Sequence, residues 1–243
     1  PRSDISSLGL FALERFEADN YTVELCARFE NSDINAGLPC SFDDSAASMS
    51  GSFLYDLNSD SNFMVSLARS QRTPQVEELH ANGANIEDAC SQGLGFDHHD
   101  DHEEDHQDDH DSVLALHAAT NLLEIGNANL DVETSNNLEL GYRKHSGSWT
   151  GEVSVYRNEI EDFIYLDITG EEVAEQRIAR YTARDATFNG FEAKFSYSVF
   201  DTGSNRASVS VFGDMVKAEF DSGENVPRIP PSKVGAEVRF SGQ

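Results

Sequence analysis

The feature that most constrains this chain is an alternation of apolar and polar residues that recurs over most of its length. In residues 191–199, Phe191 and Phe195 fall on one face of an extended strand, and Glu192 and Lys194 fall on the other. Because successive side chains of a strand point to opposite faces, such a run predicts a strand with one apolar and one polar face. Runs of this kind predict about nine strands, over 7–17, 21–30, 46–56, 62–71, 136–144, 149–158, 187–199, 206–220 and 232–240.

The predicted strands are long. Most cover about nine to fourteen residues, whereas strands of globular proteins have ~5–6 residues and tilted strands that cross a membrane need ~9–11. Their length therefore favours an all-β fold of the antiparallel transmembrane β-barrel kind, with a secreted β-sandwich or β-helix as the alternative. No run of eighteen apolar residues occurs, so we expect no transmembrane helix.

The connections between the predicted strands alternate between short and long. The short ones contain Asp, Asn, Ser or Gly, as tight turns require, and they are 18–20, 57–61, 145–148 and 201–205. The long ones are 31–45, 72–135, 159–186 and 221–231. This alternation places every long loop at one end of the sheet, as in outer-membrane barrels, which have short periplasmic turns and long extracellular loops.

About nine strands cannot close such a barrel. Bacterial single-chain barrels have even strand numbers, and an open sheet leaves backbone groups without partners in lipid. We therefore expect residues 1–243 to form a partial barrel, one segment of a larger structure.

Acidic residues far outnumber basic ones. The 44 acids and 17 bases give a net charge of −27. Phosphate binding needs Lys and Arg, so this balance argues against nucleic acid as a partner and favours metal cations. No catalytic arrangement of nucleophile and base and no phosphate-binding loop stands out, so we expect no enzyme activity.

The three cysteines do not form a CxxC pair, so a thiolate zinc site is not expected. Cys40 and Cys90 lie in predicted loops and could form a disulfide in an oxidising compartment, which the sequence leaves open. Cys26 lies in a predicted strand, where it serves as a small filler residue.

One segment of the longest loop, residues 97–111, combines histidines with acids. This tract holds five of the eight histidines, nine acids and no Lys or Arg. Imidazole suits zinc, copper and nickel, and carboxylates can complete a zinc shell. Four of the histidines recur every four residues, a spacing that places them on one face of a helix, so metal binding could order the tract as a helix. The alternative is a solvated acidic loop. The candidate metal ligands are His98, His99, His102, His106, His110, Asp100, Asp101 and Asp105.

Two segments that flank the tract resemble TonB-dependent receptors. Residues 70–83 (SQRTPQVEELHANG) resemble the family's R-x-P-x-x-x-E-L-[YFH]-x-x-G stretch at the exit of a mid-barrel strand. Residues 124–141 (EIGNANLDVETSNNLELG) resemble its E-x-G-N-P-x-L-x-x-E-x-S-x-x-x-E-x-G stretch, with Ala128 in place of the usual proline. From the residues alone, Pro74 ends a strand by removing a ladder donor, and Gly126 and Asn127 form a turn.

The resemblance covers nearly the whole chain as barrel and none of it as plug domain. It implies a barrel of ~22 strands around a plugged lumen, in contact with the lipid of the Gram-negative outer membrane. It also implies import driven by the TonB–ExbB–ExbD system, through an N-terminal part that residues 1–243 do not include. Receptors of this family with His- and Asp-rich external loops look like zinc-uptake receptors, so the resemblance favours zinc as the captured ion.

Several alternatives remain open at this stage. His80 follows the first motif near the start of the long extracellular loop, residues 72–135, and is a further candidate ligand that could take a metal from the tract. Copper and nickel fit the ligands nearly as well as zinc. Ferric siderophore and haem are alternative substrates, and a surface β-protein that buffers metal without transport is an alternative from another class.

Overall fold

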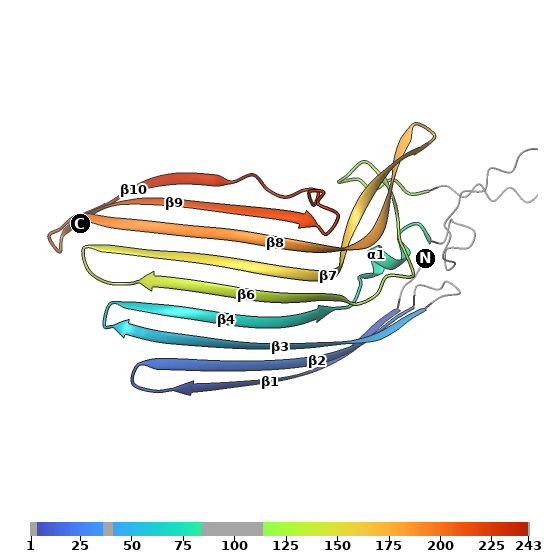
Figure 1. Cartoon of the computed structure of the whole chain (residues 1–243). Helices are drawn as coiled ribbons and strands as arrows, with labels where there is room; N and C mark the ends of the chain where they lie inside the picture. The colour runs from blue at the N-terminus through green and yellow to red at the C-terminus, as the bar shows by residue number, and fades with distance from the viewer. Residues whose placement is uncertain (1–3, 36–40, 84–113, 243) are drawn as a thin grey trace, which may run out of the picture.

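The computed structural model describes residues 4–35, 41–83 and 114–242, which form one sheet of ten strands (Figure 1). Nine long strands pair antiparallel in chain order, and they confirm the predicted all-β barrel wall. A short strand, β5 (Leu123–Ile125), pairs in parallel with β8, and a helix, α1 (Val76–His80), follows β4. The long strands are β1 (Asp4–Glu17), β2 (Tyr21–Asn35), β3 (Ser41–Asn58), β4 (Ser61–Arg72), β6 (Glu133–Lys144), β7 (Trp149–Val173), β8 (Gln176–Asp201), β9 (Asn205–Phe220) and β10 (Lys233–Gly242).

All four short turns lie at one end of the sheet, on the left of Figure 1. The first turn is closed by a hydrogen bond of 2.9 Å from the Ala18 N–H to the Tyr21 carbonyl. Neighbouring turns also contact one another, since the His145 N–H donates to the Asp60 carbonyl at 2.9 Å. The helix α1 and the strand β5 lie at the opposite end, called the loop end below, so the predicted one-sided arrangement of turns and loops is confirmed.

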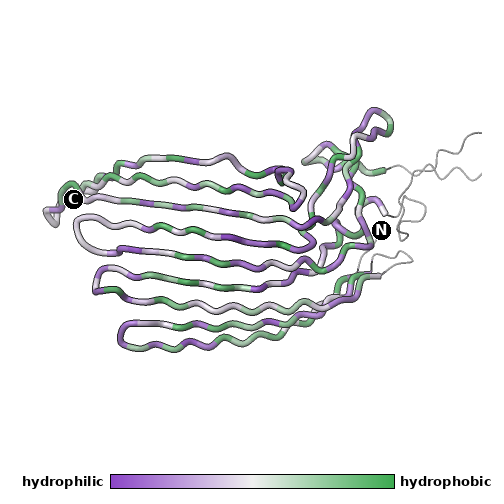
Figure 2. Tube along the Cα trace, in the orientation of Figure 1, coloured by the Kyte–Doolittle hydropathy of each residue, from purple (hydrophilic) through white to green (hydrophobic). Residues whose placement is uncertain are grey.

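The two faces of the wall differ in polarity, as the alternation predicts. The strand register aligns one row of apolar residues across six strands: Val23, Phe53, Val65, Leu140, Val155 and Phe191. The adjacent row on the other face consists of Glu24, Ser52, Ser66, Glu139, Tyr156 and Gly190. Figure 2 shows the same alternation of hydrophilic and hydrophobic positions along each strand. One face therefore suits lipid, and the other suits a polar lumen.

The apolar face forms a band with two recognisable borders. Aromatic pairs lie toward the turn end, where the ring centroids of Trp149 and Phe195 are 5.7 Å apart. Toward the loop end the band stops at Arg157, whose guanidinium pairs with the Glu159 carboxylate at 2.7 Å. The eight-residue step from Trp149 to Arg157 covers about 26 Å of strand, which is of the order of the ~25 Å apolar band of a membrane barrel.

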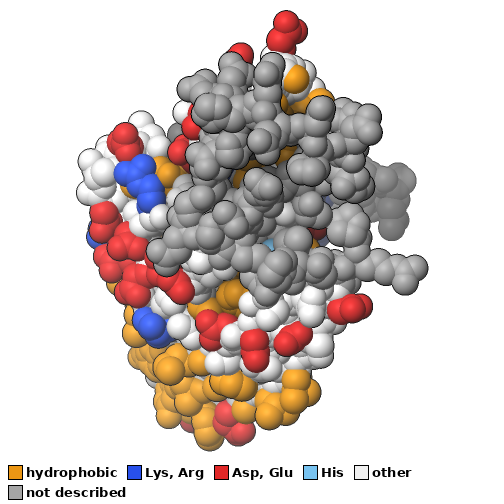
Figure 3. Space-filling view, turned by 90° about the vertical axis from the view of Figure 1, so that its right-hand side faces the viewer, with side chains coloured by type: hydrophobic (Ala, Val, Ile, Leu, Met, Phe, Trp, Pro, Cys, Tyr) orange, Lys and Arg blue, Asp and Glu red, His pale blue; other side chains and the backbone are white. Residues whose placement is uncertain are grey.

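Figure 3 looks onto the loop end and shows hydrophobic side chains covering the lower part of the molecule, where β1 to β3 lie. These strands expose large apolar side chains, including Leu10, Leu25 and Met49. None of the helices in the described ranges is long and apolar enough to cross a membrane.

The prediction of a long loop over 159–186 is wrong. These residues continue β7 and β8 as a paired hairpin that projects beyond the neighbouring strands (Figure 1). Shifts of register between Ile160 and Phe163 break the alternation that would have marked a strand. The tip is a two-residue turn in which Ala174 and Glu175 both have positive φ, at 50° and 64°, without the Gly or Asn that usually marks such a turn.

The predicted loop over 31–45 is also shorter than expected. β2 and β3 stay paired from Asn31 and Ser45 to Asn35 and Ser41. Cys40 and Cys90 lie outside the described residues, and so does the whole tract 97–111. Cys26 lies in a strand, β2, as predicted, and it is a half-buried free thiol.

The most deeply buried apolar residues gather at the loop end. One cluster joins Ile34 of β2, Leu79 of α1, Ile164 of β7 and Leu130, which lies between β5 and β6. Ile34 lies in strand register on the same face as Glu24, which is the luminal face. The luminal face of the wall therefore turns apolar where α1 and its flanking segments cover it.

Candidate functional site

The segments between β4 and β6 that the structure describes, residues 74–83 and 114–132, form a small folded unit that we call the platform. Pro74 is fully buried and follows the end of β4 directly, as its missing N–H predicts. Helix α1 comes next, and Leu79 on it is 2% exposed. Ile125 of β5 is completely buried and packs in a cluster with Ile178 of β8. The platform is thus attached to the wall by its own core.

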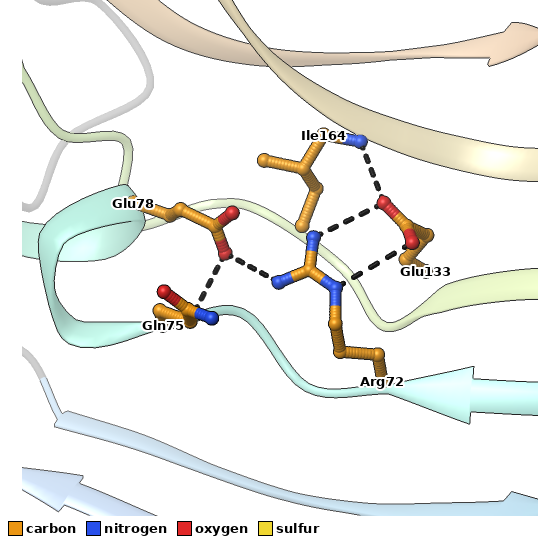
Figure 4. A network of polar contacts seen from close by, with 5 residues as sticks. All are labelled: Arg72, Gln75, Glu78, Glu133 and Ile164. Atoms are coloured by element: carbon orange, nitrogen blue, oxygen red, sulfur yellow. Dashed lines mark hydrogen bonds and ion pairs between the residues drawn. The ribbon is translucent and has the colours of Figure 1, made fainter. Parts of the chain in front are cut away.

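An arginine at the end of β4 connects the platform to the wall (Figure 4). The Arg72 guanidinium lies 2.7 Å from a carboxylate oxygen of Glu78 in α1 and 3.1 Å from one of Glu133 in β6. The Glu78 carboxylate also accepts the Gln75 N–H at 2.7 Å, and the Glu133 carboxylate accepts the Ile164 N–H at 3.0 Å. Four chain segments therefore meet at one cation, and both carboxylate residues are only 14% exposed.

Gly126 brings the second motif against α1. Its N–H donates to the Ala81 carbonyl and the Asn127 N–H donates to the Glu78 carbonyl, both at 2.8 Å. A Cβ at position 126 would overlap the backbone of His80 and of its neighbours. The glycine is therefore needed for close approach, while the Asn127 side chain accepts from the Asn129 N–H and starts the turn that the sequence predicts.

Asn82 joins the two ends of the long loop. Its side-chain amide donates to the carbonyls of Ala115 and Glu124, at 3.0 and 2.8 Å, and its oxygen accepts the Ala115 N–H at 2.7 Å. Asn82 has φ 56°, a left-handed conformation that Asn tolerates better than most residues. We call this set of bonds the root, because the part of the long loop that contains the tract begins after Asn82 and ends before Ala115 in the sequence.

A buried carboxylate lies beside the root. Glu124 is 6% exposed, and it accepts the Thr120 hydroxyl at 2.6 Å and the Tyr181 hydroxyl at 3.3 Å. The His117 Nδ1 atom lies 3.3 Å from the same carboxylate. Each Glu124 oxygen thus has a partner, as a buried acid requires.

His80 is the one predicted ligand that the structure describes. Both of its ring nitrogens are buried and have no hydrogen-bond partner. Burial lowers the pKa of His80, so its imidazole is neutral at physiological pH, and neutral imidazole is the form that binds metals. Within the described residues no group of three or more His, Cys, Asp or Glu is placed to hold a metal, so His80 belongs to no such group there.

The other predicted ligands, from His98 to His110, lie outside the described residues, so their role stays a prediction. The sequence reasoning missed Arg72, Glu133 and Asn82 as functional positions. The first two belong to the family-like motifs, but their pairing depends on the register of β4 against β6, in which Arg72 lies opposite Glu133.

Solved structures with a similar fold are transport proteins and receptors. The copper transporter OprC shares the fold with a TM-score of 0.70 at 16% identity, over 97% of this chain and 32% of its own. The ferric citrate transporter FecA has a TM-score of 0.60 at 17% identity, over 96% of this chain and 30% of its own. The pyoverdine receptor FpvA of Pseudomonas aeruginosa has a TM-score of 0.57 at 14% identity, over 97% of this chain and 28% of its own. The chain therefore spans about a third of the length of these proteins.

The family comparison agrees with the motifs and the wall. The model described as TonB dependent receptor-like, beta-barrel matches residues 1–243. Barrels of this family lie in the outer membrane, which agrees with the apolar band between Trp149 and Arg157. The chain belongs to the β-barrel family of TonB-dependent receptors.

Proposed function

We propose that this chain is a barrel segment of a receptor that imports a divalent metal, with zinc foremost, and that the tract 97–111 captures the ion outside the cell. The observation that carries the proposal is the root formed by Asn82 and Ala115. It attaches a segment with five histidines and nine acids to the loop end of the wall. A metal bound by the tract would therefore be held near the mouth of the barrel.

Covalent geometry limits how far the captured ion can lie from the platform. His110 is five residues from Ala115, so their Cα atoms are at most about 18 Å apart whatever the chain conformation. His80 is two residues from Asn82, its ring nitrogens are buried, and its lowered pKa favours the neutral form that binds metal. We propose that His80 receives the ion from the tract, and that the TonB–ExbB–ExbD system supplies the energy for import through an N-terminal part outside these residues.

The choice of zinc rests on the donor set and on the family resemblance. Imidazole and carboxylate together suit zinc, and exposed acids raise the local concentration of any divalent cation. Copper is the alternative with the most specific support, since OprC is named a copper transporter and copper binds most nitrogen ligands more tightly than zinc does. Nickel fits the same ligands.

A ferric siderophore is the alternative substrate that other neighbours favour, because FecA and FpvA are named for ferric citrate and pyoverdine. Haem would approach a strongly acidic surface with its own negative propionates, which repel it. A surface protein that buffers metal without transport would share the tract and lack any dependence on TonB.

Calorimetric titration of the intact receptor with zinc, copper and nickel tests the proposal. We compare the wild type with a variant in which His98, His99, His102, His106 and His110 are replaced by Asn, which keeps all nine acids. Loss of zinc binding in this variant is the expected result, and equal binding would refute the role of the tract. Uptake of isotopic zinc by cells with and without TonB separates transport from buffering, because a buffering protein gives equal uptake in both.

A further inference from the structure

We propose that Arg72 is a positioning residue, a latch that fixes the platform to the barrel wall and so holds the root of the long loop at the loop end. The inference rests on the proposed function, since it assigns the latch a role in passing on the ion that the tract captures. Its structural part, the attachment of platform to wall, stands on the contacts of Arg72 alone.

The latch joins charges that would otherwise be isolated. One guanidinium serves Glu78 and Glu133, and each of these carboxylates also accepts a backbone N–H from another segment. Removing Arg72 would leave two acids, each 14% exposed, facing one another without a cation. Because lysine is a point charge, it cannot reproduce the planar fork that reaches both carboxylates.

Helix α1 needs such an attachment. It has five residues, far fewer than the ~12–15 that make an isolated helix even marginally stable in water. Its other anchors include the packing of Val76 and Leu79 and the backbone bonds from Gly126 and Asn127. Beyond the short connection through the buried Pro74, the charged contact of Glu78 ties α1 to the Arg72 side chain of β4 and, through it, to Glu133 of β6.

The position of the root follows from that of α1. Asn82 is two residues beyond the end of the helix, and the root bonds all originate from its side chain. A freed α1 would loosen Asn82 and Ala115 together, and the bond from Asn82 to the Glu124 carbonyl of β5 would remain as their tie to the wall. The tract would keep its ligands and its intrinsic affinity, but its attachment points at Asn82 and Ala115 would no longer be fixed relative to the wall.

Hydrogen–deuterium exchange on the intact receptor tests the latch without any metal. In Arg72→Gln we expect the exchange rate of peptides covering 75–82 and 123–130 to rise about tenfold or more. The reason is that a buried, hydrogen-bonded charge that loses its partner lowers the local stability by an amount of that order. Peptides from the wall, such as 62–68 and 137–143, should keep wild-type exchange. Arg72→Lys should give an intermediate value.

Arg69→Gln is the matched control. Arg69 lies three residues earlier in the same strand, and its side chain makes an exposed hydrogen bond of 3.1 Å to Asn136. Arg69→Gln should leave the hydrogen exchange rate of the platform at its wild-type value. If Arg72→Gln fails to assemble, Glu78→Gln takes its place, because it keeps the Arg72–Glu133 pair and removes the charge from the link to α1, while the Gln amide oxygen can still accept the Gln75 N–H.

A second measurement tests the positioning role. Zinc titration of Arg72→Gln should give a stoichiometry and affinity within about twofold of wild type, while TonB-dependent zinc uptake falls at least about tenfold. Unchanged platform exchange overturns the latch. Raised exchange with wild-type uptake overturns its role in transfer. If the wild type itself takes up no zinc, the proposed function fails, and the exchange result still decides the latch.

Discussion

The contact between Gly126 and α1 gives the sharpest prediction for stability. In Gly126→Ala the new Cβ would overlap the His80 nitrogen and would lie 2.6 Å from the Ala81 nitrogen. These atoms belong to the backbone, so no side chain can rotate to make room. Overpacking of this kind costs about 1–3 kcal/mol, and loss of the Gly126–Ala81 hydrogen bond adds about 1 kcal/mol. We expect the local opening free energy of the platform to fall by about 2–4 kcal/mol.

Limited proteolysis and hydrogen exchange of the platform measure this loss, while the heat-modified mobility of the barrel on gels reports whether the wall has folded. The wall should stay intact, because the atoms nearest to a Cβ at position 126 belong to α1 and to Ala81 rather than to the ladder of long strands. Gly9→Ala is the control, since a Cβ there meets its nearest atom, on the Arg28 side chain, at 3.7 Å. Equal protection of the platform in Gly126→Ala and wild type would refute the close-approach argument.

Three further predictions concern single contacts. Asn82→Ala loses all root bonds and should lower the free energy of opening the root by about 1–3 kcal/mol. Faster hydrogen exchange at Ala115 measures this loss. Gly190→Ala should hinder barrel assembly because its Cβ would collide with the Tyr156 ring, and Tyr156→Ala should restore assembly in the double variant. Because burial lowers the pKa of His80, the opened platform binds more protons than the folded one. Platform stability should therefore be greatest above about pH 6.5 and decline as the pH falls toward the lower folded pKa; His80→Phe should remove this slope in exchange measured from pH 5 to 8.

The barrel wall could be predicted from sequence because each membrane strand shows a local alternation of apolar and polar residues. Val153 and Val155 alternate with Glu152 and Ser154, and no distant partner is needed to read that pattern. The extension of β7 could not be predicted in this way. A register shift near Asp162, which has φ 55°, displaces the alternation and makes a paired strand resemble a polar loop.

The platform shows a different limit of sequence reasoning. Arg72 and Glu133 are 61 positions apart, and they meet because β4 and β6 pair in one register. A one-residue slip would turn one of them to the other face of the sheet. The family motifs mark both residues without revealing that they touch, and the partnerless state of the His80 ring depends on packing that no local pattern records.

The placement of charge explains how so acidic a chain can form a membrane wall. On the lipid face the Val155 row and the adjacent Val153 row carry no charged residue, and charge begins toward the loop end where Arg157 pairs with Glu159 and Lys217 pairs with Glu219. These two pairs lie in matching rows of β7 and β9, so they form one border. Since the platform lies at the loop end of the wall, the root belongs to the aqueous side. Under the proposed function, the acids of the tract would attract a cation on that side without the cost of burying charge in lipid.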